Sequence, residues 1–419
     1  MSFARPTENR SKRVPAFWED RDIGWFFLIQ IFGFGAFGLR STILPLYVYH
    51  QTGSATALGA VAAIQYLASA IFGLFGGLIS DHFDRRAYLR LANAARVVIF
   101  GSFALLAAMQ HLTLPIIYVG LVLMGMTSTA STEFAAMTYL LPAERRGKGA
   151  ALIANGDNLA QILGYAAGGA LFGLIGGAAS ISAVAACYAV TMVCSLPIRH
   201  LGPDARKARL TAAHAISEFG AGIRFIVSSR IVLGVMSISV VAGGLCGGVS
   251  ALLIPYLTDV FHASAVTIGA FGAAGAIGTI VGMMLAGRTG DRESYGRPLV
   301  TASILLVAAL AGLVLVHAGE AFTLVCWSLA MAAFSAQSVL CRMWQVRTIP
   351  SEIGGRVMGN VGVLASLAMM GSTWACGSVA QAAGVSAVMQ FAMCVASVIL
   401  VSAAALALLV HPRSARIPR

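Results

Sequence analysis

Charged residues are scarce along this chain of 419 residues, of which only 11% are Asp, Glu, Lys or Arg while 58% are hydrophobic. Soluble domains carry about 25% charged residues, so a water-soluble fold is excluded. The hydrophobic residues fall in runs of about 20 or more, long enough for helices to cross the hydrocarbon core of a bilayer. Open strands are excluded there, because unpaired backbone groups are costly in lipid.

Three further absences narrow the function. The seven cysteines form no CxxC pair and all lie within the apolar runs, so we interpret them as packing residues rather than disulfides or metal ligands. The eight histidines form no cluster with the spacing of metal ligands. No phosphate-binding loop of the Walker type is present, so ATP is not expected as the energy source. We therefore expect no cofactor, no metal and no enzymatic activity.

The apolar runs predict an all-α membrane protein with twelve transmembrane helices. The first run, which follows a charged leader, is too long for a signal peptide and has no clear small-residue cleavage site, so we expect it to remain as a spanning helix. The expected spans are 23–49, 56–79, 87–109, 115–140, 148–172, 179–198, 230–258, 264–287, 298–317, 321–345, 356–378 and 385–410.

The spans predict two six-helix bundles, at 23–198 and 230–410. A tail at 1–22 and a tail at 411–419 flank them. The connector at 199–229 contains an amphipathic helix, because apolar residues recur there at spacings of three and four. We expect this helix to lie at the inner membrane surface, as a linker or in a regulatory role.

The basic residues predict the orientation. With both termini in the cytosol, every Lys and Arg except Arg40 lies in a cytosolic segment or near the cytosolic end of a span. The net charge of +12 is therefore a topology signal and a contact for anionic lipid headgroups. It does not indicate nucleic acid. We expect a multi-pass protein of the cell inner (plasma) membrane.

The two halves of the chain repeat one another. Residues 44–45 (Leu-Pro) correspond to residues 254–255 (Ile-Pro), and Gly59 corresponds to Gly269 at the same offset. Each half also has a short charged loop after its second span. A membrane chain built twice is typical of transporters in which one half rocks against the other.

The two charged loops carry a recognisable motif. Gly77, Asp81, Arg85 and Arg86 match the signature that follows span two in the major facilitator superfamily, and Gly287, Asp291, Arg292, Gly296 and Arg297 repeat it in the second half. The run from Leu46 to Gly59 also resembles the branch of drug:proton antiporters that contains macrolide-efflux and siderophore-exporter proteins. In the antiporter motif of span five, Tyr165 stands where that family has Pro. The resemblance implies two pseudo-symmetric six-helix bundles and a small-molecule substrate.

These loops are candidates for a cytosolic gate. We expect Asp81 to accept hydrogen bonds from the free N–H groups at the start of span eleven, where the helix dipole favours an anion. By pseudo-symmetry Asp291 would do the same at the start of span five. Arg85, Arg86, Arg292 and Arg297 would pair with acidic loop residues, or would serve only as charges that fix the orientation.

Three ionisable residues lie inside spans, where a charge is costly and indicates function. Glu133 and Asp157 are each about 13–15 Å from the cytosolic loop at 1.5 Å per residue, on consecutive antiparallel spans. They are candidates for proton coupling or substrate binding, although Asp157 could instead be bonded across a packed helix face. Arg40 is a candidate for binding an anionic substrate group, or a structural ion-pair partner. Polar residues that could line the path are Gln65, Asn158, Gln161, Gln337, Trp344 and Gln345.

The sequence thus predicts a secondary transporter that exports a lipophilic small molecule in exchange for protons. Two alternatives stay open: uptake of an anionic metabolite or nutrient, and a sensor on the same fold that transports nothing. The expected partners are the substrate, protons and membrane lipids, with the chain acting as a monomer.

Overall fold

In the computed structural model, the residues described below are 21–82, 84–141, 146–201, 212–228, 230–289, 296–315, 319–349, 351–385, 387–388, 390–391, 394–395 and 397–398. All regular secondary structure in these residues is helical, which confirms the all-α fold. Eight of the helices are long and apolar enough to cross a membrane. Twelve crossings and cytosolic termini stay predictions.

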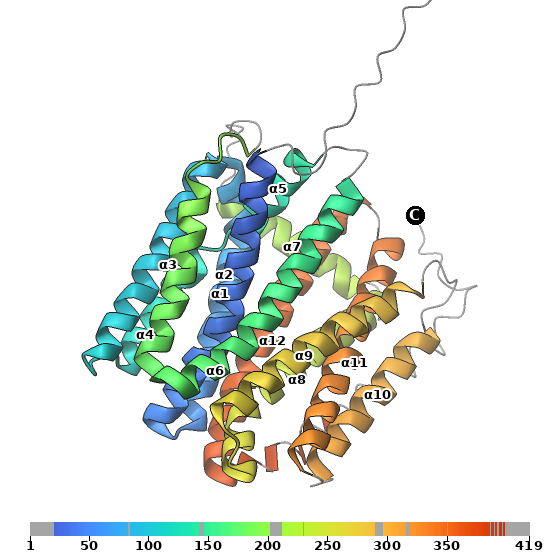
Figure 1. The fold of residues 1–419 in the computed structure, drawn as a ribbon. Helices are drawn as coiled ribbons and strands as arrows, with labels where there is room; N and C mark the ends of the chain where they lie inside the picture. Colours follow the sequence, from blue (N-terminus) through green and yellow to red (C-terminus); the bar gives the residue numbers. More distant parts are fainter. Residues whose placement is uncertain are drawn as a thin grey trace, which may run out of the picture.

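The helices follow the chain in a simple order (Figure 1). Elements α1 to α4 lie at the left of that view and α9 to α11 at the right. We call α1 to α6 the N-terminal half and α8 to α12 the C-terminal half. The elements are α1 (Arg21–Thr52), α2 (Ala55–His82), α3 (Arg85–Ala108), α4 (Leu114–Met126), α5 (Ala130–Leu140), α6 (Arg146–Ser195), α7 (Ala212–Ser228), α8 (Arg230–Phe261), α9 (Ala265–Gly287), α10 (Gly296–Leu315), α11 (Glu320–Thr348) and α12 (Ser351–Ala383).

Side-chain caps fix several helix starts. Asp84 precedes α3 and accepts a hydrogen bond from the backbone N–H of Arg86 at 2.9 Å. Ser264 precedes α9 and accepts one from the N–H of Thr267 at 3.2 Å. Such caps satisfy backbone donors that have no partner within the helix. The starts of α3 and α9 are therefore specified by local polar residues.

The expected span at 115–140 is not one continuous helix, because α4 and α5 replace it. Thr127, Ser128 and Thr129 separate them. The hydroxyl of Thr127 donates to the carbonyl of Met124 at 2.7 Å. Ser and Thr side chains compete in this way with the backbone bonds of a helix. The break lies within the expected span rather than at its end.

Element α6 consists of two helical segments that meet at Gly176, where φ is 78° and ψ is 173°. This break lies between the spans expected at 148–172 and 179–198. That φ lies in the left-handed region, which glycine adopts without steric cost. Gly176 thus interrupts the helix between the two expected spans.

Several expected regions lie wholly or partly outside the described residues. They are the tail at 1–22 except for its last two residues, most of the span at 385–410, the tail at 411–419 and the first part of the connector. The rest of the connector forms α7, which packs against α8 and α12. There Ile226 is buried, and the side chain of Asn360 donates to the carbonyl of Phe219 at 2.7 Å.

The two halves meet at one end of the bundle, at the bottom of Figure 1. There α2 packs along α12 and α6 along α9. A Cβ on Gly377 would lie 3.0 Å from the Cα of Gly59. A Cβ on Gly269 would lie 2.9 Å from the Cα of Gly169. Glycine at both crossings lets the backbones approach closely, as small residues do in membrane helices.

Polar bonds reinforce this end. The Tyr49 hydroxyl donates to Asp259 Oδ1 at 2.7 Å, between residues 210 positions apart. Gln381 Oε1 accepts from the N–H of Ala55 at 3.1 Å. In the described part of the chain, all hydrogen bonds between the two halves lie at this end. We call it the closed end.

Candidate functional site

A cavity of about 800 Å³ lies between the halves. Its walls come from α1 to α6 on one side and from α8, α9 and α11 on the other. Aromatic side chains contribute much of the lining: Phe34, Phe37, Tyr66, Tyr165, Tyr188 and Trp327. The volume is in the range of small-molecule sites, which are mostly apolar with a few polar groups.

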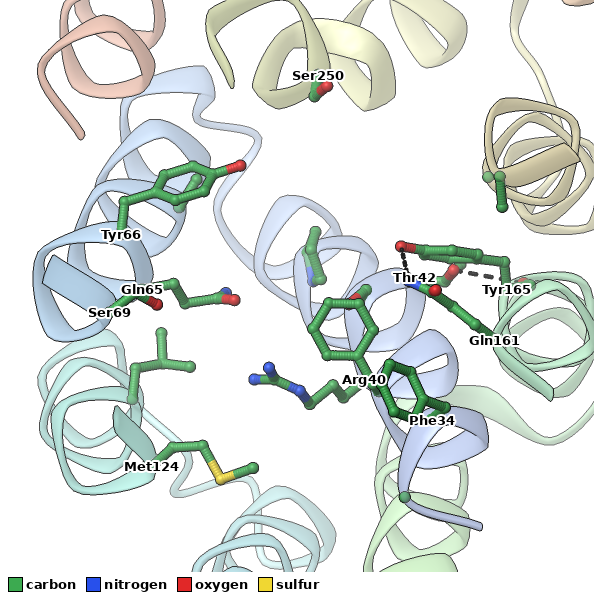
Figure 2. Close-up of a pocket in the computed structure, with 18 of the residues that line it drawn as sticks. Phe34, Arg40, Thr42, Gln65, Tyr66, Ser69, Met124, Gln161, Tyr165 and Ser250 are labelled. Atoms are coloured by element: carbon green, nitrogen blue, oxygen red, sulfur yellow. Dashed lines mark hydrogen bonds between the residues drawn. The ribbon is translucent and has the colours of Figure 1, made fainter. Parts of the chain in front are cut away.

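Arg40 extends from α1 into this cavity, toward Gln65 of α2 (Figure 2). Its guanidinium lies 5.0 Å from the centre of the Phe37 ring. Its Nε is buried without a hydrogen-bond partner. Among the described residues Arg40 takes part in no ion pair, so no described carboxylate neutralises it.

Arg96 lines the same cavity from α3 and has the opposite surroundings. Its Nη2 donates to the carbonyl of Thr127 at 2.6 Å and to the hydroxyl of Thr129 at 2.8 Å. Its Nη1 donates to Asn93 Oδ1 at 3.1 Å, and its Nε donates to the hydroxyl of Thr127 at 3.2 Å. Arg96 therefore holds the break between α4 and α5, satisfying backbone oxygen that the broken helix leaves without a partner.

Glu133 joins this network. The Thr129 hydroxyl, which accepts from Arg96, donates to Glu133 Oε1 at 2.6 Å. Asp157 on α6 lies close enough to Glu133 for an electrostatic interaction. Its Oδ1 is buried and has no hydrogen-bond partner. The structure thus brings Glu133 and Asp157 together, but Glu133 lines the cavity and Asp157 does not.

The remaining polar candidates divide into two groups. Gln65, Asn158 and Gln161 line the cavity. Gln161 Nε2 donates to the Tyr165 hydroxyl at 3.2 Å, a bond drawn in Figure 2. Gln337, Trp344 and Gln345 are buried in α11 and do not belong to the lining. Gln345 donates to the Met236 sulfur at 3.2 Å, while both polar atoms of the Gln337 side chain lack a partner.

The gate candidates are only partly described. Asp291 and Arg292 lie outside the described residues, and Gly77 and Asp81 are placed only as backbone of α2. Gly287 ends α9, and Arg297 is exposed near the start of α10. Arg85 is half-buried, with its Nε lacking a partner. The acidic partners proposed for the arginines are not among the described side chains.

Arg86 makes a local contact instead. Its guanidinium contacts Asp84 Oδ2 at 3.4 Å and donates to the carbonyl of Arg199 at 2.5 Å. Partial burial acts to raise the pKa of Asp84, but the hydrogen bonds and charge of Arg86 outweigh it and leave that pKa below its usual value. The Arg86–Asp84 pair thus ties the loop before α3 to the end of the N-terminal half.

Arg96 lines the cavity but was not singled out from the sequence. Its expected place is near the cytosolic end of its span, yet it lies 11 positions into α3, or about 16 Å at the rise of a helix. That depth matches the depth expected for Glu133. The distance along the helix was a sufficient signal, and it was available from the sequence.

The family follows from a match over most of the chain. The family model described as Major Facilitator Superfamily matches residues 26–373. This protein belongs to the Major Facilitator Superfamily. The family and its solved structures are transporters rather than enzymes, which confirms both the resemblance and the expected absence of enzymatic activity. In the described residues no three His, Cys, Asp or Glu side chains gather as metal ligands.

Curated relatives include siderophore exporters. The chain is 26% identical over 270 residues to the enterobactin exporter EntS of Shigella boydii serotype 18, covering 62% of each chain. It is 24% identical over 286 residues to EntS of Citrobacter koseri, covering 66% of each. The match thus spans somewhat less than two thirds of these relatives' length. The resemblance to a branch that contains siderophore exporters is confirmed.

Solved structures share the fold. A mutant of the nucleoside transporter NupG superposes with a TM-score of 0.76 at 11% identity, covering 92% of this chain and 100% of that one. The D-xylose-proton symporter gives 0.69 at 16% identity, covering 96% and 100%. An inward-facing, unoccupied bacterial homologue of the lysosomal transporter Spinster gives 0.68 at 14%, covering 93% and 96%. At these identities the likeness concerns the fold alone.

Proposed function

We propose that this superfamily member exports a lipophilic small molecule across the plasma membrane in exchange for protons, by alternating access. One observation carries the proposal. The cavity is shared by helices of both halves, and the hydrogen bonds joining the described residues of those halves lie at one end of it. A pocket so placed can face either side of the membrane if the halves rock.

The orientation proposed from the basic residues makes the closed end the outer one. With the termini cytosolic, the turns at 53–54 and 262–264 face outward, and the cavity is accessible from the cytosol. This is the state in which an exporter loads its substrate. The aromatic and aliphatic lining suits a lipophilic molecule.

Glu133 and Asp157 are the groups we propose for proton coupling. The two carboxyl groups lie close enough to interact electrostatically, and acidic side chains inside spans are candidates for proton relays. The Thr129 hydroxyl connects Glu133 to Arg96, because it accepts a hydrogen bond from Arg96 and donates one to Glu133. Protonation of Glu133 would weaken its hydrogen bond with Thr129 and so alter the α4–α5 break. The proton would thereby act on the cavity wall itself.

We propose that the cytosolic gate lies at the end of the bundle opposite the closed end. There Asp81 and Asp291, with Gly77, Gly287 and the arginines Arg85, Arg86, Arg292 and Arg297, would join the halves when the closed end opens. We propose a monomer of two halves, 23–198 and 230–410, linked by 199–229. Membrane lipids contact its apolar surface, and their anionic headgroups its basic loops.

The relatives matched by sequence favour export over uptake, because they are named as exporters. Arg40 is the observation that favours the second candidate, uptake of an anionic metabolite. The direction of flux decides between them. A sensor on the same fold would move neither solute nor protons.

Flux in proteoliposomes with an imposed pH gradient tests the proposal. We expect wild-type protein to accumulate an exported probe against its gradient. Glu133→Gln and Asp157→Asn should lower this accumulation by about tenfold or more while sparing exchange of probe across the membrane without a gradient. Unchanged accumulation in both variants would remove these carboxyls from the mechanism. The absence of flux for an entire panel of lipophilic probes would favour the sensor.

A further inference from the structure

The charged groups of the cavity do not balance. Its described lining contains Arg40, Arg96 and Glu133, and no other Asp, Glu, Lys or Arg. Two cations thus face one carboxylate. Protonation of Glu133 would increase the excess of positive charge. Asp157 lies close to Glu133 but outside the lining and adds a second carboxyl group behind it, so the surroundings of Arg40, rather than the total charge, favour an anion.

The two arginines are not equally available to a ligand. Arg96 uses its guanidinium in four hydrogen bonds to Asn93, Thr127 and Thr129. Arg40 makes no hydrogen bond and no ion pair with any described residue. Its guanidinium lies 5.0 Å from the centre of the Phe37 ring and also interacts electrostatically with Tyr165. A guanidinium has five N–H donors in a planar fork that matches the two oxygens of an acidic group.

Other unsatisfied groups in the lining have the same polarity. Three lining side chains carry a buried polar atom that lacks a partner: Arg40 Nε, Asn93 Nδ2 and Trp327 Nε1. All three atoms are N–H donors. Buried donors are normally paired. Arg40 and Asn93 belong to the N-terminal half and Trp327 to the C-terminal half, so both sides of the cavity leave N–H donors without a partner, whereas no buried side-chain acceptor of the described lining lacks one.

We propose that the substrate of this cavity is an amphiphilic organic anion with an aromatic body, whose acidic oxygens bind the guanidinium of Arg40. The ring of such a ligand would lie among Phe34, Phe37 and Tyr66 of the lining, of which Phe34 and Tyr66 are labelled in Figure 2. The cavity of about 800 Å³ accommodates a molecule of drug size. The proposal rests on the proposed function only in taking this cavity as the substrate site.

Equilibrium binding tests this class without any flux measurement. The full chain in detergent is titrated in a calorimeter with 2-naphthoate, with its neutral isostere 2-naphthamide and with the lipophilic cation tetraphenylphosphonium. We expect naphthoate to bind most tightly. Arg40→Gln should weaken naphthoate binding about tenfold or more and leave naphthamide unchanged, and Arg40→Lys should fall between. Arg224→Gln, an exposed cation of α7, is the matched control and should bind as wild type does.

Several results would overturn the proposal. They are equal affinity for naphthoate and naphthamide, tighter binding of the cation, unchanged naphthoate affinity in Arg40→Gln, or no binding of naphthoate. If Arg40→Gln does not fold, the three-probe comparison on wild type and Arg40→Lys still decides. Failure of proton-driven flux with naphthoate binding intact would count against the proposed function alone.

Discussion

At the scale of residues, the cavity contains one arginine whose donors are satisfied and one whose donors are free. Arg96 bonds the residues that separate α4 from α5, so its role is to hold the cavity wall. Arg40 has no such bonds and faces the open space. From the sequence, Arg40 and Glu133 were predicted to lie inside the spans, and both line the cavity. The sequence could not show which side chains have partners, since partners come from other helices.

Replacing Arg96 should therefore destabilise the protein. Arg96→Met keeps the length of the side chain but leaves the Thr127 carbonyl and Asn93 Oδ1 without their donor, at about 1–3 kcal/mol for each. We expect the thermal unfolding midpoint of the detergent-solubilised protein to fall by several degrees. Arg224→Met, an exposed replacement on α7, should melt as the wild type does. Equal midpoints for Arg96→Met and wild type would show that the bonds do not hold the break.

At the scale of elements, long apolar runs predicted most helices because length and hydropathy suffice to define a span. The break between α4 and α5 was not predicted, since Thr127 and Thr129 lie inside an otherwise apolar run. The break at Gly176 does fall between the expected spans at 148–172 and 179–198, although the sequence did not single out this glycine, because glycine is frequent within the spans. The exact position of a helix break within a hydrophobic run was thus the feature that the sequence predicted least well.

The glycine crossings can be tested one helix at a time. In Gly377→Val the Cβ would lie 2.6 Å from the carbonyl oxygen of Ala55, so α2 and α12 should move apart. Gly371→Val is the matched control on the same helix, because nothing lies within 4 Å of its Cβ. We expect Gly377→Val, and not Gly371→Val, to speed maleimide labelling of a cysteine at Thr56. Equal labelling rates in the two variants would show that the close approach does not seal this end.

At the scale of the whole molecule, the contacts at the closed end involve equivalent positions of the two halves. Tyr49 and Asp259, which hydrogen-bond to one another, are 210 positions apart. Gly59 and Gly269 have the same offset, and each meets a glycine of the other half. The sequence repeat predicted equivalent positions in the two halves. It did not predict which helices cross, because the pairing of α2 with α12 and of α6 with α9 depends on the packing of both halves.

The most direct test of alternating access is a pair of spin-label distances measured by pulsed electron paramagnetic resonance in lipid. Labels at Gln51 and Ala382 report the closed end, and labels at Ala87 and Thr301 report the opposite end, in a background without native cysteines. We expect most molecules to show a short distance between the labels at the closed end and a long distance between the labels at the opposite end. A change of pH should convert part of this population into one with a long distance at the closed end and a short distance at the opposite end. Distances that stay fixed at both ends, or that lengthen and shorten together, would contradict the account.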